Sequence, residues 1–409
     1  MEDIFDDLND MQKKAVQMTE GPLLILAGAG SGKTRTIINR IAYILKSGLA
    51  RPYQVIALTF TNKAAGEMRE RISAFGIDNI EDMWMGTFHS LCARILRIHA
   101  EDIGFTRNFT IYDESDSKKL MNGILDELRI SDKAMPVDML LAVISKAKNE
   151  TVSPEDFLGE NFDMYRAEDI AKIYASYQEK LRYNNAMDFD DLLFNCYELF
   201  RVNEEVLGHY QNRFRYILVD EYQDTNRLQY EIIAMMARMH QNICVCGDDD
   251  QSIYGWRGAD IRNILEFEQD FPDAEVIRLE QNYRSTSNIL DAANRVIEHN
   301  TGRKGKTLWT DHGAGEKIHI MASSRDLEEA DRIASEIERL ARSGYKYGEC
   351  AVLYRVNSQS RTLEEGLIRR NIPYQIVRGT RFYDRMEIKD ILDERLLKFQ
   401  KVSNTHYQL

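Results

Sequence analysis

The sequence has little of what would mark a secreted, membrane-spanning or disulfide-stabilised protein. Its 409 residues include only 5 cysteines and 6 prolines, and no apolar run approaches the ~20 residues that span a bilayer. The one close cysteine pair, Cys244 and Cys246, lacks a second pair with which to form a zinc site. The N-terminus is acidic, whereas a secretory signal begins with basic residues. We therefore expect a cytoplasmic protein with buried, reduced thiols.

An excess of basic residues is also lacking, since the formal net charge is -13. Proteins that attract nucleic acid through their overall charge carry the opposite sign. A motor that slides along a single strand needs only a local basic or aromatic track, so the acidic total does not exclude a nucleic-acid partner. The length exceeds what one hydrophobic core usually supports, and two or more domains are expected.

The strongest signal is a glycine-rich stretch between an apolar run and a segment of helical period. The apolar run covers residues 23–26, and AGAGSGKT follows at residues 27–34. A strand, a glycine-rich turn and a helix together form a cradle for phosphate. Lys33 would reach the β- and γ-phosphates, and Thr34 would hold Mg²⁺. Ala27 replaces the first glycine of the usual pattern, and a flexible turn between core elements is the alternative interpretation.

Two adjacent acids follow a second apolar run, at residues 216–219. Carboxylates at a buried strand end are costly unless a ligand or partner compensates them. Asp220 would bind Mg²⁺, and Glu221 would orient and deprotonate the attacking water. Gln12 could read an adenine edge with its amide, although an exposed surface glutamine is the simpler interpretation.

A third acidic segment follows the apolar run at residues 243–246 and contains Gln251. Tyr254 and Trp256 come next, in a glycine-containing loop, where they would serve as stacking platforms for unpaired bases. One segment would thus touch ATP at one end and a single strand at the other. Tyr283 and Arg284, after a further strand, could supply a ring to adenine and a charge to the γ-phosphate.

Polar residues also follow the apolar run at residues 55–60. Thr61, Asn62 and Lys63 suit a nucleic-acid phosphate, because open parallel sheets place ligands at the carboxyl ends of their strands. Phe88 and His89 follow a further short run, and ordinary packing at a helix start is the favoured interpretation from this segment alone.

The remaining chain divides by periodicity. Residues 91–187 have helical period and are interpreted as a helical insertion. After residue 285 the strand and helix signals alternate again, with strands expected at 318–321 and 351–354 and helices at 327–340 and 363–368. The basic run at residues 303–306 could touch nucleic acid or be a solvated loop.

The motifs in their order and spacing resemble the UvrD/Rep/PcrA family of superfamily 1 DNA helicases. The segments that carry the resemblance are LNDMQ, AGAGSGKT, TFTNKAAGEM, GTFHS, MDFDDLL, VDEYQDTN, GDDDQSIYGWRGA, LEQNYRST, AVLYRVNSQSR (351–361) and GTRFYDRMEIKDIL (379–392). The resemblance extends from residue 8 to about residue 392.

The resemblance implies an α/β fold, a P-loop NTPase with RecA-like parallel sheets, a helical insertion in the first motor domain and an incomplete second motor domain. It places the first motor domain at residues 1–108 and 186–280 and the insertion at 109–185. A partial second motor domain would cover residues 281–392, and a divergent tail residues 393–409.

The resemblance also implies roles for individual residues. Contacts to ATP are expected from Gln12, Ala27, Gly28, Ala29, Gly30, Ser31, Gly32, Lys33, Thr34, Arg35, Tyr283 and Arg284. Catalytic roles are expected for Lys33, Asp220, Glu221, Gln251 and Arg284, with Thr34 and Asp220 as ligands of Mg²⁺. A DNA track would comprise Thr61, Asn62, Lys63, Phe88, His89, Tyr254, Trp256 and Arg257.

The implied function is ATP-dependent 3′→5′ translocation on single-stranded DNA with duplex unwinding. Single strands and single/double-strand junctions would be the substrates, repair or replication proteins would be possible partners, and no membrane would be involved. Two family motifs, of the forms TIHSAKGLEF and VAITRA, do not occur in this sequence. Because an arginine that completes an ATP site is worth 10³–10⁵ in rate, we expect a truncated chain that binds Mg-ATP, and single-stranded DNA weakly, but unwinds poorly or not at all.

Two other functions are considered. The first is a nucleotide-gated module that binds single-stranded DNA without useful turnover, which a Glu221→Gln change would distinguish from an ATPase. The second is an ATPase unrelated to DNA, which is disfavoured because it leaves the aromatic GWRGA segment unexplained.

Overall fold

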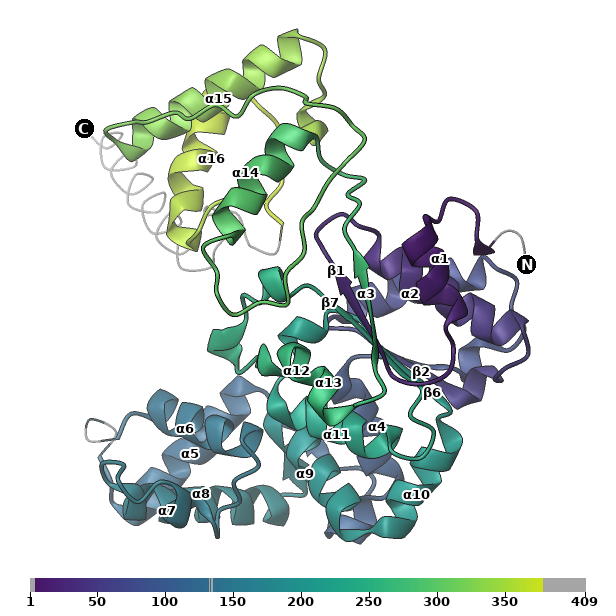
Figure 1. Ribbon diagram of the computed structural model, residues 1–409. Coiled ribbons are helices and arrows are strands. Elements are labelled where there is room, and N and C mark those ends of the chain that lie inside the picture. Colours follow the sequence, from purple (N-terminus) through teal and green to yellow (C-terminus); the bar gives the residue numbers. More distant parts are fainter. Residues whose placement is uncertain (1–3, 132, 134, 378–409) are drawn as a thin grey trace, which may run out of the picture. The chain divides into compact units, whose positions relative to one another are not determined.

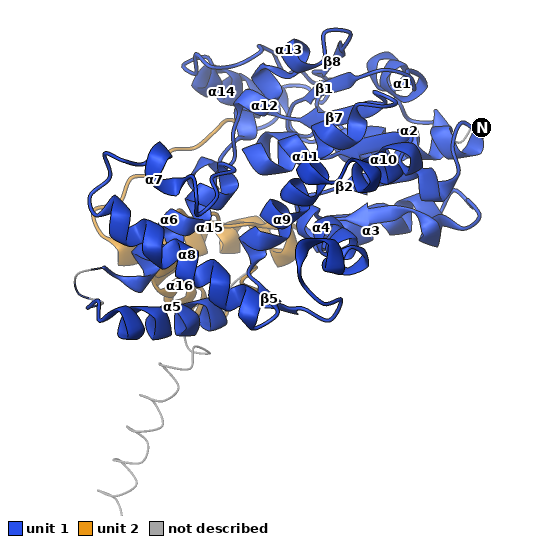
Figure 2. Cartoon of the chain, turned by 90° about the horizontal axis from the view of Figure 1, so that it is seen from below, with its two compact units in different colours: residues 1–316 blue, residues 317–409 orange. Residues whose placement is uncertain are grey.

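The structure, a computed structural model, describes residues 4–131, 133 and 135–377 (Figure 1). The chain forms two compact units, residues 1–316 (unit 1) and residues 317–409 (unit 2), which Figure 2 shows in different colours. The motif at residues 379–392 and the tail at 393–409 lie outside the described residues.

A six-stranded sheet with the order β3-β2-β6-β7-β1-β8 lies at the centre of unit 1. Its strands are β1 (Leu23–Ala27), β2 (Val55–Leu58), β3 (Trp84–Gly86), β6 (Tyr216–Val219), β7 (Ile243–Gly247) and β8 (Glu275–Leu279). All neighbouring strands pair in parallel, and Leu24 of β1 lies opposite Val245 of β7 and Val276 of β8. Strands buried on both faces are continuous apolar runs, which is why these segments show no alternation in the sequence.

Helices cover both faces of this sheet. One face carries α1 (Asp10–Gln17), α2 (Lys33–Lys46) and α3 (Asn62–Ser73), and the other carries α4 (Phe88–Ile98), α9 (Phe189–Val202), α10 (Glu204–Arg213) and α11 (Arg227–Ala237). Successive residues of a strand point to opposite faces, so Leu23 packs in the same core cluster as Ile37 of α2, whereas Leu24 packs in that of Ile232 of α11. The α/β fold with a parallel sheet, expected from the sequence, is confirmed.

A group of helices interrupts unit 1 between two short strands. It comprises α5 (Glu114–Leu128), α6 (Val137–Asn149), α7 (Phe157–Glu160) and α8 (Ala167–Tyr183), with a hydrophobic cluster of its own. The chain enters this group after β4 (Thr110–Ile111) and leaves it before β5 (Ala186–Met187). These two strands pair in parallel, so the group leaves and rejoins the rest of unit 1 at neighbouring points.

The other elements described in unit 1 are further helices and 3₁₀ turns. The helices are α12 (Arg262–Leu265), α13 (Phe267–Asp270) and α14 (Ser287–Ile297), and the 3₁₀ turns of unit 1 are η2 (Pro52–Gln54), η3 (Ile80–Asp82), η4 (Ala100–Ile103), η5 (Tyr222–Asp224), η6 (Asp249–Gln251) and η7 (Gly255–Arg257). Among the described residues, no helix is both long and apolar enough to cross a bilayer.

Unit 2 contains α15 (Asp326–Arg342), α16 (Ser360–Arg369) and the turns η8 (Tyr347–Glu349) and η9 (Asn357–Gln359). The two helices expected there are confirmed. The strands expected at residues 318–321 and 351–354 are wrong, since neither segment is a strand and Ile320 and Leu353 are 93% and 95% exposed. A strand is held by the ladder of a neighbour, and residues 317–377 supply no such pairing for either apolar run.

Candidate nucleotide and nucleic-acid site

The phosphate loop, residues 28–32, connects β1 to the start of α2. Gly30 and Gly32 have φ values of 70° and 85°, a backbone region that favours glycine. All five loop carbonyls accept hydrogen bonds: Gly28 from Ser31, Ala29 from Asn282, Gly30 from Tyr283, Ser31 from Gln12 and Gly32 from Thr36. Because the carbonyls are committed to protein donors, the loop and the α2 N-terminus offer a bound anion their N–H groups.

Two carboxylates at the end of β6 face the first two side chains of α2. Lys33 Nζ lies 2.9 Å from Glu221 Oε2, and Thr34 Oγ1 donates to Asp220 Oδ2 at 3.3 Å. β6 and β1 lie two positions apart in the sheet, with β7 between them, so residues far apart in the chain meet at one carboxyl edge. Glu221 has a φ of 52°, a costly conformation for a non-glycine residue that is concentrated at functional sites.

The charges of these residues are strongly perturbed. Burial and the neighbouring Glu221 carboxylate raise the pKa of Asp220 to about 6. Burial alone would raise the pKa of Glu221 too, but Lys33 and the Gln223 amide lower it below its ordinary value. A buried carboxylate that resists ionisation beside a second one is a site that a cation would stabilise. The oxygens of Thr34 and Asp220 are the kind of ligands that Mg²⁺ prefers, so these residues fit the metal.

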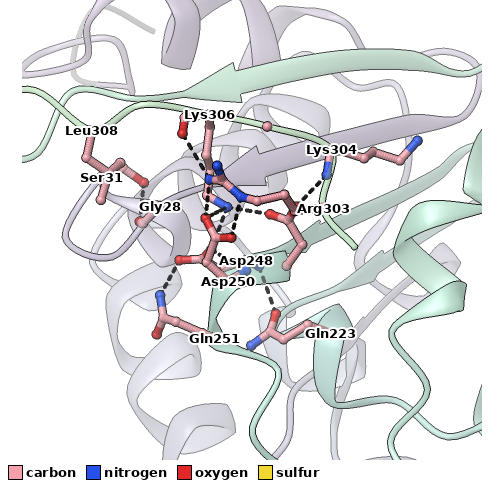
Figure 3. A network of polar contacts seen from close by, with 12 residues as sticks. Gly28, Ser31, Gln223, Asp248, Asp250, Gln251, Arg303, Lys304, Lys306 and Leu308 are labelled. Atoms are coloured by element: carbon pink, nitrogen blue, oxygen red, sulfur yellow. Dashed lines mark hydrogen bonds and ion pairs between the residues drawn. The ribbon is translucent and has the colours of Figure 1, made fainter. Parts of the chain in front are cut away.

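A chain of amide contacts leads from Glu221 to the segment after β7. Gln223 Nε2 donates to Glu221 Oε2 at 2.9 Å, and the backbone N–H of Asp248 donates to Gln223 Oε1 at 2.9 Å. Asp248 in turn accepts a hydrogen bond from the side-chain amide of Gln251 (Figure 3). The structure therefore connects Gln251 to Glu221 through two intermediate residues, Asp248 and Gln223.

The residues expected at adenine meet around Asn9. Gln12 is buried, and its amide accepts from the Asn9 N–H and donates to the Ser31 carbonyl. The Tyr283 hydroxyl accepts from Asn9 Nδ2 at 2.8 Å and donates to Gln281 Oε1 at 2.9 Å. Sequence reasoning missed Asn9 and Gln281. The Asn-x-x-Gln capping box at the start of α1 was the available signal for Asn9.

The two arginines expected at ATP occupy different surroundings. Arg284 is exposed, yet its Cβ lies 2.9 Å from where a Cβ on Gly30 would stand, so it borders the phosphate loop. Arg35 is exposed on α2, and its Nη1 donates to the Asp7 carbonyl at 3.4 Å.

Three aromatic side chains from the segments after β2 and β7 lie next to one another. The rings of Phe60 and Tyr254 stack with centroids 5.1 Å apart, and those of Tyr254 and Trp256 are 6.4 Å apart. Trp256 is 74% exposed. Phe60 was missed because it ends an apolar run in the sequence, although its place directly before Thr61 was a signal. We call Phe60, Tyr254 and Trp256 the aromatic row.

The other residues expected on a DNA track differ in how exposed they are. Thr61 caps α3 by accepting the Ala64 N–H, and Asn62 and Lys63 are exposed in the first turn. His89 is half-buried and packs edge-on against Phe189. Arg257 is the last residue of η7.

Phe88 is not brought to the surface. Its ring is only 5% exposed and belongs to the core cluster between α4 and the sheet. The packing interpretation weighed for this residue from the sequence therefore describes its side chain.

The basic run at residues 303–306 is neither a solvated loop nor an open cationic patch. Arg303 forms a two-pronged ion pair with Asp250, at 2.8 and 2.7 Å, and Lys306 is buried among three aspartates. The solvated-loop interpretation is wrong, because the acids after β7 pair with these cations within unit 1, while a contact with nucleic acid stays a prediction.

The fold and the site together define a class of protein. A parallel sheet, a glycine-rich loop running into a helix, and a lysine and threonine that face two acids on another strand of that sheet are the parts of a P-loop nucleoside triphosphatase.

Comparisons with known proteins narrow this class. The model of the UvrD/REP helicase N-terminal domain matches residues 8–272, and that of the UvrD-like helicase C-terminal domain matches residues 277–400. The chain belongs to the UvrD/Rep helicase family. It is similar to proteins named ATP-dependent DNA helicase PcrA from Staphylococcus epidermidis (50% identical over 392 residues) and Staphylococcus aureus strain COL (51% identical over 392 residues). These matches cover 96% of this chain and 54% of each relative, so the chain spans about half the length of the curated relatives.

Proposed function

We propose that this chain binds Mg-ATP and hydrolyses it in response to single-stranded DNA, as the motor portion of a 3′→5′ DNA helicase. The observation that carries the proposal is the meeting of Lys33 and Thr34 with Asp220 and Glu221, at the sheet edge from which the aromatic row also projects. The relatives are named as ATP-dependent DNA helicases, and the direction of movement is the one that the family resemblance implies.

The resting arrangement suggests how the nucleotide would engage the site. Lys33 is paired with Glu221, and a triphosphate in the loop would compete for this ammonium group. Once Lys33 binds phosphate, the Glu221 carboxylate is free to accept a proton from water. Thr34 and Asp220 would hold Mg²⁺, which supplies charge stabilisation to the transferred phosphoryl group. Gln251 and Arg284 would sense the γ-phosphate, while Asn9, Gln12 and Tyr283 would surround adenine.

The aromatic row would bind successive bases of a single strand. Stacking on aromatic side chains tolerates any base sequence, which suits a protein that moves along DNA. Thr61, Asn62 and Lys63 at the start of α3 would contact the phosphate backbone. Two members of the row, Tyr254 and Trp256, share the segment after β7 with Gln251, so a change at the nucleotide has a short path to the bases.

We also propose the domain assignment made from the sequence. Residues 1–108 and 186–280 would form the ATP-binding motor domain, residues 109–185 an inserted subdomain, and residues 281–392 part of a second motor domain.

The first test is steady-state ATP hydrolysis by the 409-residue chain, with and without a single-stranded oligonucleotide. We expect DNA to stimulate turnover and Glu221→Gln to lower the rate about 10²–10⁴-fold, because the general base is lost. Lys33→Ala serves as the blank, and Glu205→Gln, an exposed change on α10, should match the unchanged chain.

A different result would replace the proposal. If nucleotide alters DNA affinity but Glu221→Gln leaves a rate no different from the unchanged chain, the chain is a nucleotide-gated DNA-binding module without useful turnover.

The second test addresses the aromatic row. Phe60→Ala and Trp256→Ala should weaken binding of a labelled oligothymidine by about 1–3 kcal/mol for each base that loses its platform, while nucleotide affinity is retained. Tyr183→Ala, at an exposed tyrosine of α8, is the control. Equal affinity in all four proteins, measured by fluorescence anisotropy, would show that the row does not bind DNA.

A further inference from the structure

Three successive carboxylates after β7 surround one buried lysine (Figure 3). The side chains of Asp248, Asp249 and Asp250 converge so that oxygens of all three lie within 4.8 Å of one another. Lys306 Nζ lies 2.7 Å from Asp248 Oδ1 and 2.7 Å from Asp250 Oδ2, and it also contacts Asp249. Its side chain is only 2% exposed. The ammonium group therefore occupies the place that a metal ion would take in such a cluster.

The rest of the same segment completes the neutralisation of these acids. Arg303 donates two hydrogen bonds to Asp250, and its Nη2 also donates to the Lys306 carbonyl at 3.0 Å. The Lys304 N–H donates to Asp249 Oδ2 at 2.8 Å. We call residues 303–309 the cationic strap. Its contacts leave each of the three acids with at least two donors from the strap or from Gln251.

The cationic strap also touches the nucleotide residues directly. Leu308 fills the space beside Gly28 of the phosphate loop. The Trp309 N–H donates to the Glu280 carbonyl at 3.0 Å, and the Trp309 carbonyl accepts the Asn282 N–H at 2.7 Å. The Asn282 side-chain amide in turn donates a hydrogen bond to the Ala29 carbonyl of the phosphate loop. One segment thus contacts the phosphate loop and the acids after β7.

The path from Lys306 to the catalytic groups is short. Asp248 lies between Lys306 on one side and the Gln251 amide on the other. Its backbone N–H donates a hydrogen bond to the Gln223 side chain, which in turn donates one to Glu221. Without the ammonium group, three adjacent carboxylates, two of them buried, would repel one another and the loop would have to rearrange. Gln251 would then lose the acceptor that orients its amide.

Lys306 and Asp250 both remain charged near neutral pH. Burial would raise the pKa of Asp250, but Arg303 and Lys306 lower it below its ordinary value. Burial would lower the pKa of Lys306, but the aspartates raise it. The contact between Lys306 and Asp250 is thus an ion pair rather than a neutral hydrogen bond.

We propose that Lys306 is a positioning residue for γ-phosphate recognition, because it holds Asp248 and thereby orients the Gln251 amide. The inference rests on the proposed function, since it assumes that Gln251 senses the γ-phosphate. The cationic strap then acts as a fixed internal counter-charge that holds the loop after β7 in place relative to the phosphate loop.

The test measures equilibrium binding rather than turnover. Dissociation constants for ADP and for the non-hydrolysable ATP analogue with an imido bridge are measured with the 409-residue chain. The dissociation constant for ADP divided by that for the analogue reports recognition of the γ-phosphate. Lys306→Met should reduce this ratio at least about fivefold, equivalent to roughly 1 kcal/mol, while the affinity for ADP changes less than about twofold. Lys304→Met is the matched control, because Lys304 pairs with Glu268 outside the aspartate cluster and should keep the ratio.

Two further variants make the result decisive. Gln251→Ala should reduce the ratio by the same factor, and adding Lys306→Met to it should cause no further loss, because the lysine acts through the glutamine. Should Lys306→Met fail to fold, the double change Lys306→Met with Asp249→Asn has one buried charge fewer and should show the same reduced ratio.

The possible failures are distinct. A lower melting temperature with an unchanged ratio would show that Lys306 is only structural, and an unchanged ratio in Gln251→Ala would also overturn the inference. Absence of DNA-stimulated hydrolysis in the unchanged chain would instead refute the proposed function, which the binding ratio does not measure.

Discussion

At the scale of single residues, the glycines of the phosphate loop have different reasons to be glycine. Gly30 and Gly32 have positive φ values, so a side chain there would strain the backbone. Gly28 has no such φ, but a Cβ on it would overlap Leu308 Cδ2 and come within 3.0 Å of Cδ1 and Cγ. The requirement at Gly28 comes from packing against a residue 280 positions away in the chain.

This difference predicts that the cost of a substitution at Gly28 can be relieved elsewhere. Gly28→Ala should destabilise the chain by about 1–3 kcal/mol, because Leu308 must move out of a packed position. Adding Leu308→Ala should remove most of that extra cost, whereas it should not rescue Gly30→Ala. Urea unfolding of the single and double variants measures the coupling. Strictly additive effects of Gly28→Ala and Leu308→Ala would contradict this packing argument.

His89 provides a prediction about pH. Burial lowers its pKa below the ordinary value, and the attraction of Asp190 only partly offsets this. Well above about pH 6.5 the histidine is neutral in the folded and in the unfolded chain, so it does not lower the free energy of unfolding. As the pH falls below that value, the unfolded chain gains a proton that the folded chain resists, so stability declines toward the lowered folded pKa.

The comparison of two proteins isolates this contribution. The urea midpoint of the unchanged chain should fall more between about pH 7.5 and about pH 5.5 than that of His89→Gln, which has no group to protonate. His209→Gln serves as a control at another histidine. If both variants follow the unchanged chain at every pH, His89 does not contribute to the pH dependence.

At the scale of elements, a buried ion cluster joins α6 to the start of α9. Lys148 Nζ lies 2.7 Å from both Asp188 Oδ2 and Asp191 Oδ1, and its side chain is 0% exposed. Asp188 also caps α9 and accepts the Tyr177 hydroxyl of α8. Carboxylates at a helix start interact favourably with the helix dipole, and these two also hold a lysine from the inserted helices.

Removal of this lysine should loosen the inserted helices from α9. Lys148→Met leaves the buried Asp191 and the half-buried Asp188 without their cation, which should cost about 3–5 kcal/mol of unfolding free energy. Lys146→Met is the matched control, because Lys146 forms only an exposed pair with Glu150 and should change stability by less than about 1 kcal/mol. Equal unfolding free energies for the two variants would show that the cluster contributes little.

The neighbouring Asn149 extends this junction toward the nucleotide residues. Its Nδ2 donates to Asp190 at 2.9 Å, and its Oδ1 accepts from Asn226, which caps α11 after the segment containing Glu221. The inserted helices are therefore tied to the rest of unit 1 by polar groups that follow β6 at the carboxyl edge of the sheet.

At the scale of the whole molecule, the two units differ in how much apolar surface they bury. Unit 1 contains two large core clusters on the two faces of its sheet and a third in the inserted helices. The described part of unit 2 has a small cluster built on Ala334, Ile337 and Ile372. Local stability follows buried apolar contact, so opening should cost less free energy in unit 2.

Amide hydrogen exchange tests this difference in the unaltered chain. Peptides from α15 and α16 should exchange at least about 10²-fold faster than peptides from β1 and β7. Peptides from the exposed first turn of α3 provide a fast-exchanging reference within unit 1. Equal protection in α15 and β7 would contradict the expected ranking.

Local patterns in the sequence determined the strands of the central sheet, the helices between them and the phosphate loop. These features depend on neighbours in the chain: an apolar run, a glycine turn and a helical period are legible within a few residues. The sequence also assigned Lys33, Thr34, Asp220 and Glu221 to one site. The structure brings them together because the carboxyl ends of parallel strands meet at one edge, but it alone showed the pairs Lys33–Glu221 and Thr34–Asp220.

Only the tertiary structure decided which residues surround these groups. It placed Phe60 in the aromatic row and Phe88 in the core, although both follow or end similar short runs. It gave residues 318–321 and 351–354 no strand partner in the described part of unit 2. It brought Lys306 into the aspartate cluster and Leu308 onto Gly28. Contacts between residues hundreds of positions apart depend on packing and charge in three dimensions, and no local pattern in the chain encodes them.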